Sequence, residues 1–300
     1  SKRALLIFCA DNGVVEEGVS QTGQEVTAAV VSNMTRGRSC SCLMAEKAET
    51  DVFPIDMGIA CELEHRGELH PLTERKIRRG TSNFTKAAAM TRQEVLTAIL
   101  TGIDAVRVLK EQGYRLFAVG EMGIGNTTTS SAVASVLLQK DPELVTGAGA
   151  GLDSAGLKRK TEGIRRGIGL HHPDPMDGME VLQKVGGFDL AAMAGAFLGG
   201  AIYHVPVVID GVIAAAAAAA AGRIAPAATD YMLAAHVSAE PASIWLLDLI
   251  GVTPAIQAGL RLGEGTGALA LFPLLDMALS IYRDMDTFAE MEIEEYKPLV

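Results

Sequence analysis

The sequence predicts an α/β protein with a doubly wound, mainly parallel sheet flanked by helices. Apolar runs typical of buried parallel strands, such as residues 4–10, 51–58 and 205–211, alternate with helix-like segments along the chain. Each run ends in, or is followed by, an Asp and a Gly, and ligands of open parallel sheets bind beyond the carboxyl ends of the strands. A hydrophobic content of 49% over 300 residues is ample for one large core. We therefore expect one α/β domain over residues 1–300.

Helical segments connect the predicted strands in the first half of the chain. Residues 24–34 predict one helix. Thr91 and Glu94 have the spacing of a capping box at the start of another, which ends at Gly113. The polar stretch 62–89 is either a solvated excursion or a loop that folds over a ligand.

Small residues dominate two predicted helices in the second half. Ala, Gly and Met fill the segment after Asp189, and an alanine run ends at Ala221. Such residues allow a helix to pack closely against a sheet. An apolar segment, residues 269–277, follows near the C-terminus.

A glycine-rich turn runs into a hydroxyl-rich helix start near the middle of the chain. Gly123 and Gly125 lie in the turn, and Asn126, Thr127 and Thr128 begin the helix. Such a turn directs free N–H groups and the positive helix end at an anion, and a phosphate fits best. The glycine spacing matches neither the dinucleotide fingerprint nor the P-loop. We therefore predict a site for a monophosphate rather than for a dinucleotide or a nucleoside triphosphate.

A second loop of small residues follows. It contains Gly147, Gly149 and Gly151, and the helix after it supplies Lys158 and Lys160. One of these lysines is a candidate to reach a bound phosphate. The alternative is that both are merely solvated, as most lysines in such runs are.

One carboxylate, Glu264, lies between Gly263 and Gly265, just before the apolar C-terminal segment. Flanking glycines adopt torsions closed to other residues and let a backbone approach a ligand closely. Glu264 is therefore a candidate for the general base of a transferase. On these residues alone, the alternative is a turn with a solvated Glu.

The net charge of −10 disfavours a nucleic-acid-binding surface, because phosphate backbones need concentrated Lys and Arg. Cys9, Cys40, Cys42 and Cys61 crowd the start of a long chain and do not resemble a disulfide framework, which indicates a reduced, cytoplasmic protein. Cys40 and Cys42 have no second ligand pair at metal-binding spacing. We interpret them as buried helix thiols and predict no metal site.

Membrane segments are not expected either. Ser1, Lys2 and Arg3 lead directly into a strand-like run, so we predict no signal peptide. The most apolar stretch, 191–221, is interrupted by polar residues and Pro206, and a buried strand followed by a helix explains it better than a membrane span.

A set of motifs in unbroken order carries a family resemblance: residues 120–128, 186–189, 210–211, 238–240 and 262–265. With them the chain closely resembles the nicotinate-nucleotide:dimethylbenzimidazole phosphoribosyltransferases, which make the lower-ligand nucleotide of cobamides. The resemblance runs from Leu5 to Phe288. It implies a Rossmann-like fold with a small helical subdomain to which residues 270–300 contribute. Family members carry a further N-terminal helical stretch, which this chain lacks.

The resemblance also implies a reaction, the transfer of 5-phosphoribose from nicotinate mononucleotide to an aromatic base with inversion from β to α. The leaving group departs with its pyridinium charge neutralised, so no general acid is needed on that side. The incoming N–H or hydroxyl must instead lose its proton to a carboxylate base. Because the phosphate stays on the sugar, the resemblance implies neither magnesium nor another cofactor.

Matched positions then assign residues to roles. The resemblance implies that Glu264 is the base, that Glu121 is a second functional carboxylate and that Lys160 is the phosphate-side lysine. The other substrate-binding and phosphate-binding residues that it implies are Gly123, Gly125, Asn126, Thr127, Thr128, Gly147, Gly149, Asp210 and Ser238.

The acceptor pocket is where the chain departs from the family pattern. Members that use dimethylbenzimidazole can place a Gln where this chain has Val30, and a Ser where it has Thr22. A buried ring nitrogen left without a partner costs about 1–3 kcal/mol. We therefore expect the pocket to tolerate, or prefer, a less polar acceptor such as a phenol.

The resemblance further implies a dimer, because the family's N-terminal segment helps to build the dimer contacts. We expect a homodimer, or a heterodimer with a paralogous subunit that supplies the missing part. Two rival functions are a catalytically silent partner subunit and a phosphoribose-binding module without chemistry. A nicotinamide-dependent oxidoreductase is disfavoured because its glycine fingerprint is absent.

Overall fold

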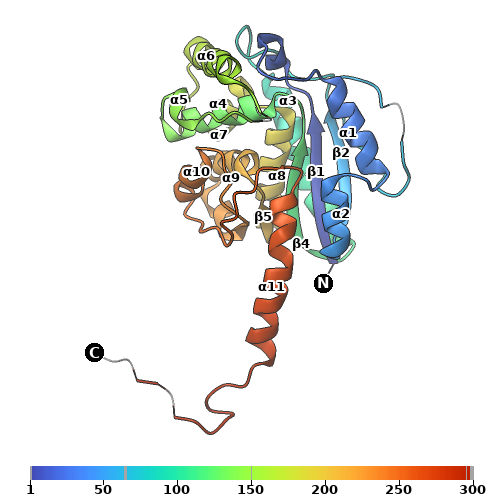
Figure 1. The fold of residues 1–300 in the computed structure, drawn as a ribbon, viewed down its shortest axis with the longest axis vertical. Helices are drawn as coiled ribbons and strands as arrows, with labels where there is room; N and C mark the ends of the chain where they lie inside the picture. Colours follow the sequence, from blue (N-terminus) through green and yellow to red (C-terminus); the bar gives the residue numbers. More distant parts are fainter. Residues whose placement is uncertain (1, 64–65, 150, 295, 298–300) are drawn as a thin grey trace.

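Six parallel strands form one sheet, in the order β3-β2-β1-β4-β5-β6 (Figure 1). The computed structural model describes residues 2–63, 66–149, 151–294 and 296–297. All pairings between the named strands are parallel, which confirms the predicted doubly wound sheet. The strands are β1 (Lys2–Ala10), β2 (Asp51–Gly58), β3 (Thr73–Glu74), β4 (Tyr114–Met122), β5 (Val207–Ile209) and β6 (Met232–Ala234).

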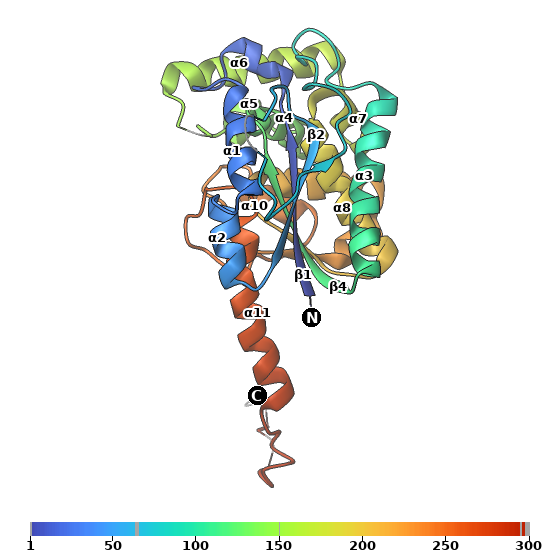
Figure 2. The same cartoon turned by 90° about the vertical axis from the view of Figure 1, so that its right-hand side faces the viewer.

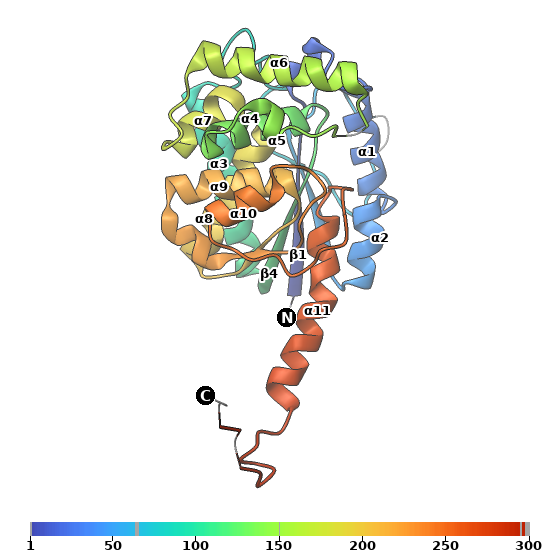
Figure 3. The ribbon, with the colours of Figure 1, turned by 60° about the vertical axis from the view of Figure 1, so that its left-hand side comes forward.

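Helices cover both faces of this sheet (Figure 2). One face carries α1 (Glu25–Thr35), α2 (Cys40–Lys47) and α11 (Thr266–Asp284). The other carries α3 (Arg92–Glu111), α8 (Phe188–Tyr203) and α9 (Val212–Ile224). The remaining helices are α4 (Asn126–Leu138), α5 (Pro142–Val145), α6 (Ser154–His171), α7 (Gly178–Val185), α10 (Ser243–Leu249) and the 3₁₀ helices η1 (Gly13–Glu17) and η2 (Pro226–Tyr231). Of these, α4 to α7 gather toward the end of the sheet opposite the N-terminus (Figure 3).

The central strand β1 shows how the sequence separates the two faces. Leu5, Ile7 and Cys9 belong to the apolar cluster under α1, α2 and α11. Leu6 and Phe8 belong to the larger cluster under α3, α8 and α9. Successive side chains of a strand point to opposite faces, so a strand covered on both sides is apolar throughout.

Local signals in the sequence are confirmed at several helices. Thr91 Oγ1 accepts a hydrogen bond from the Glu94 N–H at 3.2 Å, and the Glu94 carboxylate accepts one from the Thr91 N–H at 2.7 Å, which completes the predicted capping box. The two small-residue helices are α8 and α9. The expectation of two buried thiols is wrong in part: Cys42 is buried but Cys40 is exposed, because the buried face of α2 carries Ser41, Cys42 and Ala45.

Some sequence predictions fall outside the described residues. These are residues 64–65 of the polar stretch, residue 150 of the second small-residue loop, and residues 295 and 298–300 of the predicted helical subdomain. Toward that end of the chain, α11 extends beyond the sheet and away from the body of the protein (Figure 1).

Among the helices that the structure describes, none combines the length and the apolar character needed to cross a membrane.

The helices α3 and α8 pack with their backbones in contact. A Cβ added to Gly102 would lie 1.9 Å from the carbonyl oxygen of Ala192, and one added to Gly195 would lie 2.0 Å from that of Ile99. Backbone atoms cannot rotate away as the end of a side chain can. Glycine at these two positions therefore sets how closely α3 and α8 pack.

We expect Gly102→Ala to lower the free energy of unfolding by about 1–3 kcal/mol, the usual cost of overpacking a tight interface. Gly169→Ala in α6 is the matched control, because no described atom lies within 4 Å of its added Cβ. This control should gain up to about 1 kcal/mol from better helix propensity. Urea unfolding of both variants measures the difference, and equal stability of the two would contradict the packing argument.

Candidate active site

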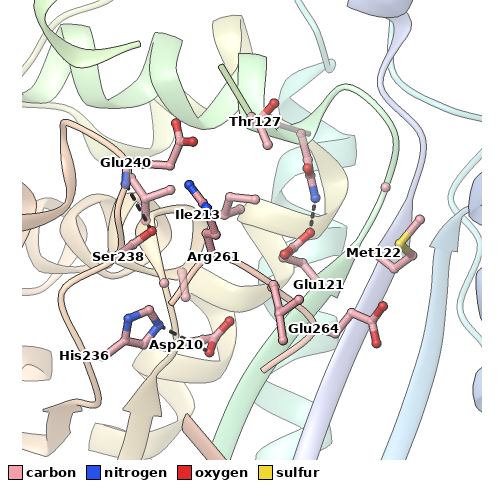
Figure 4. A pocket seen from close by; sticks show the side chains of 18 of the residues that line it. Glu121, Met122, Thr127, Asp210, Ile213, His236, Ser238, Glu240, Arg261 and Glu264 are labelled. Carbon is pink, nitrogen blue, oxygen red and sulfur yellow. Dashed lines mark hydrogen bonds and ion pairs between the residues drawn. The ribbon is translucent and has the colours of Figure 1, made fainter. Parts of the chain in front are cut away.

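A cavity of about 230 Å³ opens beyond the carboxyl ends of β4 and β5, beside the first residues of α4 and α9 (Figure 4). This is the edge of a parallel sheet at which ligands bind. Both carboxylates that the resemblance singles out, Glu121 and Glu264, belong to residues that line it. The cavity is lined by Glu121, Met122, Gly123, Ile124, Asn126, Thr127, Gly149, Asp210, Gly211, Val212, Ile213, Ala214, His236, Ser238, Glu240, Arg261, Leu262, Gly263 and Glu264.

Glu264 lies in a turn of three consecutive residues with left-handed backbone. The angle φ is +79° at Gly263, +58° at Glu264 and +82° at Gly265. Glycine adopts this region freely, whereas a residue with a side chain does so at a cost of about 1–2 kcal/mol. The turn also rests on β4, since a Cβ on Gly120 would lie 2.6 Å from the carbonyl carbon of Glu264. The side chain of Glu264 extends on the side of the cavity where Met122 lies (Figure 4).

Asp210 ties this turn to the end of β5. Its Oδ1 accepts hydrogen bonds from the N–H groups of Gly267 at 2.7 Å and Ala268 at 3.1 Å, and its Oδ2 accepts one from Gly265 at 3.2 Å. The negative charge therefore lies at the positive N-terminal end of α11. Burial raises the pKa of Asp210 above its ordinary value, whereas His236, whose Nε2 lies 3.9 Å from Oδ1, favours the charged form. Since both oxygens already accept backbone hydrogen bonds, Asp210 holds the turn in place.

Glu121, at the end of β4, is a buried carboxyl group in the cavity wall. Burial raises its pKa well above the ordinary value of 4.5, and the charge of Asp189 raises it further. Asn126 Nδ2 donates a hydrogen bond to its Oε2. Its Oε1 lies against the turn, because a Cβ on Gly263 would be 2.9 Å away. The protonated form is thus favoured, and a protonated carboxyl can donate a hydrogen bond to a ligand.

Lys160 is fully buried beside the loop that carries Gly149. Its Nζ donates hydrogen bonds to Thr127 Oγ1 at 3.0 Å and to the carbonyl oxygen of Gly147 at 3.1 Å. Burial lowers the pKa of Lys160 to about 8, and the charge of Glu240 partly offsets this effect. Within the described part of the chain Lys160 forms no salt bridge. A buried cation beside the first turn of α4 makes this end of the cavity favourable for an anion.

The structure brings most of the predicted site residues together. Those that line the cavity are Glu264, Glu121, Gly123, Asn126, Thr127, Gly149, Asp210 and Ser238. Four others lie next to the lining without being part of it: Gly125, the N-cap of α4 with φ of +94°; Thr128, buried in α4; Gly147, in the loop that carries Gly149; and Lys160 of α6, hydrogen-bonded to Thr127 and Gly147.

The two predicted acceptor-pocket residues do not line the cavity. Thr22 is exposed before α1. Val30 is partly buried in α1 and packs against the apolar cluster that Met122 also contacts. The segment that carries them therefore lies on the Met122 side of the sheet.

Two of the three strand-end aspartates also lie elsewhere. Asp11 Oδ1 accepts a hydrogen bond from Thr27 Oγ1 at 2.6 Å, and Asp56 Oδ2 lies 3.1 Å from Lys76 Nζ. Neither carboxylate belongs to the lining of the cavity. The polar stretch 62–89 contributes no described residue to the lining.

Sequence reasoning interpreted residues 236–241 as a polar loop beside the site, and His236 and Glu240 of that loop do line the cavity. It gave Ile213 and Arg261 no role. Ile213 lies at the start of α9, so applying the strand-end rule to every strand could have found it. Arg261 is exposed and lies three residues before Glu264 in the same loop. This closeness in the sequence to a predicted base could have marked Arg261 as a site residue. Glu240 is brought in by tertiary packing, since a Cβ on Gly147 would lie 1.9 Å from its Oε2.

Asp189 gives the region a testable pH dependence. It is fully buried, and burial raises its pKa from 3.8 to about 7. The folded protein therefore binds this proton more tightly than the unfolded chain does. The resulting stabilisation of the folded state is complete below about pH 4 and is lost as the pH rises to about 7. Against Asp189→Asn, the wild type should lose roughly 4 kcal/mol of unfolding free energy over this window. Urea unfolding at several pH values measures it. Asp248→Asn, at an exposed position, is the control, and parallel curves for wild type and Asp189→Asn would contradict the argument.

Comparison with known proteins agrees with this geometry. The family model DBI_PRT, described as a phosphoribosyltransferase, matches residues 1–293. A nicotinate-nucleotide–dimethylbenzimidazole phosphoribosyltransferase of Ruminiclostridium cellulolyticum is 46% identical over 99% of this chain and 83% of its own, and one of Clostridium acetobutylicum is 45% identical over the same shares. The crystal structure of CobT from Thermus thermophilus superposes with a TM-score of 0.92 at 39% identity, covering 99% of this chain and 87% of that one. The chain therefore belongs to the phosphoribosyltransferase family that includes these nicotinate-nucleotide–dimethylbenzimidazole enzymes.

Proposed function

We propose that this protein transfers the 5-phosphoribosyl group of nicotinate mononucleotide to 5,6-dimethylbenzimidazole and so makes the lower-ligand nucleotide of a cobamide. The proposal depends on one observation, that Glu264 lines the same cavity as Thr127, the hydrogen-bond partner of the buried Lys160. A base and an anion site on one cavity suit the transfer of a phosphorylated sugar to an N–H acceptor. The names of the relatives specify this pair of substrates.

In this reaction the bond between C1′ and the pyridinium nitrogen breaks, and its electron pair passes to the nitrogen. Nicotinate then leaves with an uncharged ring. As a ring nitrogen of the acceptor bonds to C1′ on the α face, the acceptor loses its N–H proton to the Glu264 carboxylate. Glu121, in its protonated form, donates a hydrogen bond to the bound ribose.

The phosphate of the substrate lies at the start of α4 in this proposal. The positive end of the helix and the Thr127 hydroxyl bind it directly, and Lys160 supplies the positive charge through its contact with Thr127. The residues proposed to shape this end of the cavity are Gly123, Gly125, Asn126, Thr128, Gly147, Gly149 and Ser238. Asp210 takes part indirectly, through the turn that it holds.

The aromatic acceptor binds on the Met122 side of the cavity, where Glu264 extends. Met122 provides apolar wall there. A phenolic acceptor is a second candidate, favoured because Val30 packs against the same apolar cluster as Met122. A phenol has no second ring nitrogen to satisfy, whereas a benzimidazole does.

We also propose that the protein works in a reduced, cytoplasmic compartment and as a dimer, with itself or with a paralogous subunit. All four cysteines are free thiols, in keeping with a reducing compartment. Met277, Ile281 and Tyr282 expose 56%, 59% and 87% of their surface on α11, and a partner would cover this apolar surface. The part of α11 that extends beyond the sheet is our candidate for the small helical subdomain from residue 270 onward.

Glu264→Gln tests the base. We expect kcat to fall at least about 100-fold, because the amide cannot accept the acceptor's proton. The KM for nicotinate mononucleotide should change little. Chromatography of released nicotinate measures kcat and KM, and NMR identifies the anomer of the ribotide product. Glu49→Gln, at an exposed Glu that also has a positive φ, is the control. A variant that keeps the wild-type rate would contradict the assignment, and a wild type that releases no nicotinate would favour the silent-subunit alternative.

Val30→Gln tests the acceptor side. With 5,6-dimethylbenzimidazole and p-cresol at equal concentration, the wild type should form both products. The variant should shift the product ratio about tenfold toward the benzimidazole, because one hydrogen bond to its second nitrogen is gained. Leu100→Gln, at an exposed position of α3 on the other face of the sheet, is the control. Exclusive use of the benzimidazole by the wild type, or an unchanged ratio, would contradict a role for Val30.

A further inference from the structure

We propose that Ser41 is a positioning residue for Glu264, and that Ser39 and Ser41 form a hydroxyl relay that matches both charge states of its carboxyl group. This inference rests on the proposed function, in which Glu264 takes the proton of the acceptor. Neither serine lines the cavity, so both act through Glu264 rather than on the substrate.

The contacts form a continuous chain from the N-terminus of α2 to the cavity. Ser41 Oγ donates a hydrogen bond to Glu264 Oε2 at 2.9 Å. Ser39 Oγ lies 2.7 Å from Ser41 Oγ, accepts a hydrogen bond from the Cys42 N–H at 3.2 Å, and is 3.2 Å from Cys42 Sγ. Among the described residues, only Ser41 forms a hydrogen bond with the carboxyl group of Glu264.

Because the two serines are buried, their hydrogen bonds fix the rotamer of Glu264 more firmly than a contact at the surface would. Ser41 has no exposed surface and Ser39 has only 7%. Water therefore does not compete for their hydroxyl groups, and a buried hydroxyl without a partner is costly. The carboxyl group of Glu264 is partly exposed and long enough to adopt several rotamers, so the contact with Ser41 selects one of them.

The direction of the chain follows from counting protons. When Glu264 is ionised, Ser41 gives its only proton to the carboxylate, so Ser39 must donate to Ser41. The Cys42 N–H and the positive end of α2 then support the negative charge through Ser39. Both hydroxyl groups thus point toward the base before the reaction.

Once Glu264 has taken the proton, the same atoms can serve in the opposite direction. The protonated carboxyl donates to Ser41 Oγ, Ser41 donates to Ser39, and Ser39 donates to Cys42 Sγ. Each oxygen has a partner in either state, so the side chain need not move when its charge changes. Among the described contacts, the backbone of Glu264 is held by Asp210 through Gly265, whereas the carboxyl group is held by Ser41.

Ser41→Ala measured by steady-state kinetics tests the inference. We expect kcat to fall about tenfold, because the carboxylate loses its fixed rotamer, while the KM for nicotinate mononucleotide and the melting temperature stay close to wild type. Ser41→Thr, which keeps the hydroxyl, should recover most of kcat. Ser280→Ala removes another serine–carboxylate hydrogen bond, to Asp284 on the distant part of α11, and serves as the control.

A double-mutant cycle with Glu264→Asp shows whether Ser41 acts through Glu264. The shorter carboxylate falls short of Ser41, so adding Ser41→Ala to it should change kcat by less than about twofold. A kcat of Ser41→Ala within twofold of wild type would overturn the inference. So would an equal loss in the two backgrounds. A wild type that releases no nicotinate contradicts the proposed function instead, and the rotamer of Glu264 in crystals of Ser41→Ala then decides the contact by itself.

Discussion

The hydrogen bonds that Asp210 accepts from the first turn of α11 are the constraint on which the cavity depends. They join the end of β5 to the turn of Gly263, Glu264 and Gly265. Without a buried acceptor, these N–H groups would be left without partners inside the protein. The clamp also fixes the strained backbone of Glu264, so the base and the end of the sheet keep one geometry. Strain of this kind persists only where the surroundings determine it.

Around that clamp, burial separates the charges of the cavity. Burial raises the pKa values of Glu121 and Asp189 above their ordinary values, whereas Glu264 is partly exposed and lies beside the Ser41 hydroxyl. The positive charge of Lys160 lies at the other end, next to α4. A protein with a net charge of −10 can therefore still present a local site for an anion.

Much of the fold and part of the site could be predicted from the sequence because their signals are local. Apolar runs marked β1, β2 and β5, and glycines marked the turns around Glu121 and Glu264. The strands β3 and β6, of two and three residues, are too short to show a period. Ser41 could not be found because 223 residues separate it from Glu264 in the chain. The strand-end rule placed Asp210 correctly, but no spacing revealed that backbone N–H groups occupy both of its oxygens.

The burial of Lys160 couples two properties that are usually selected separately. An ammonium group buried away from water, with no counter-charge in contact among the described residues, weakens the empty fold through its desolvation, and the same burial strengthens its attraction for a phosphate. A neutral side chain of similar length would relieve the first effect and abolish the second. Selection for heat resistance alone would therefore tend to erode substrate affinity at this position, so the lysine marks a point where evolution of the enzyme must trade durability against activity.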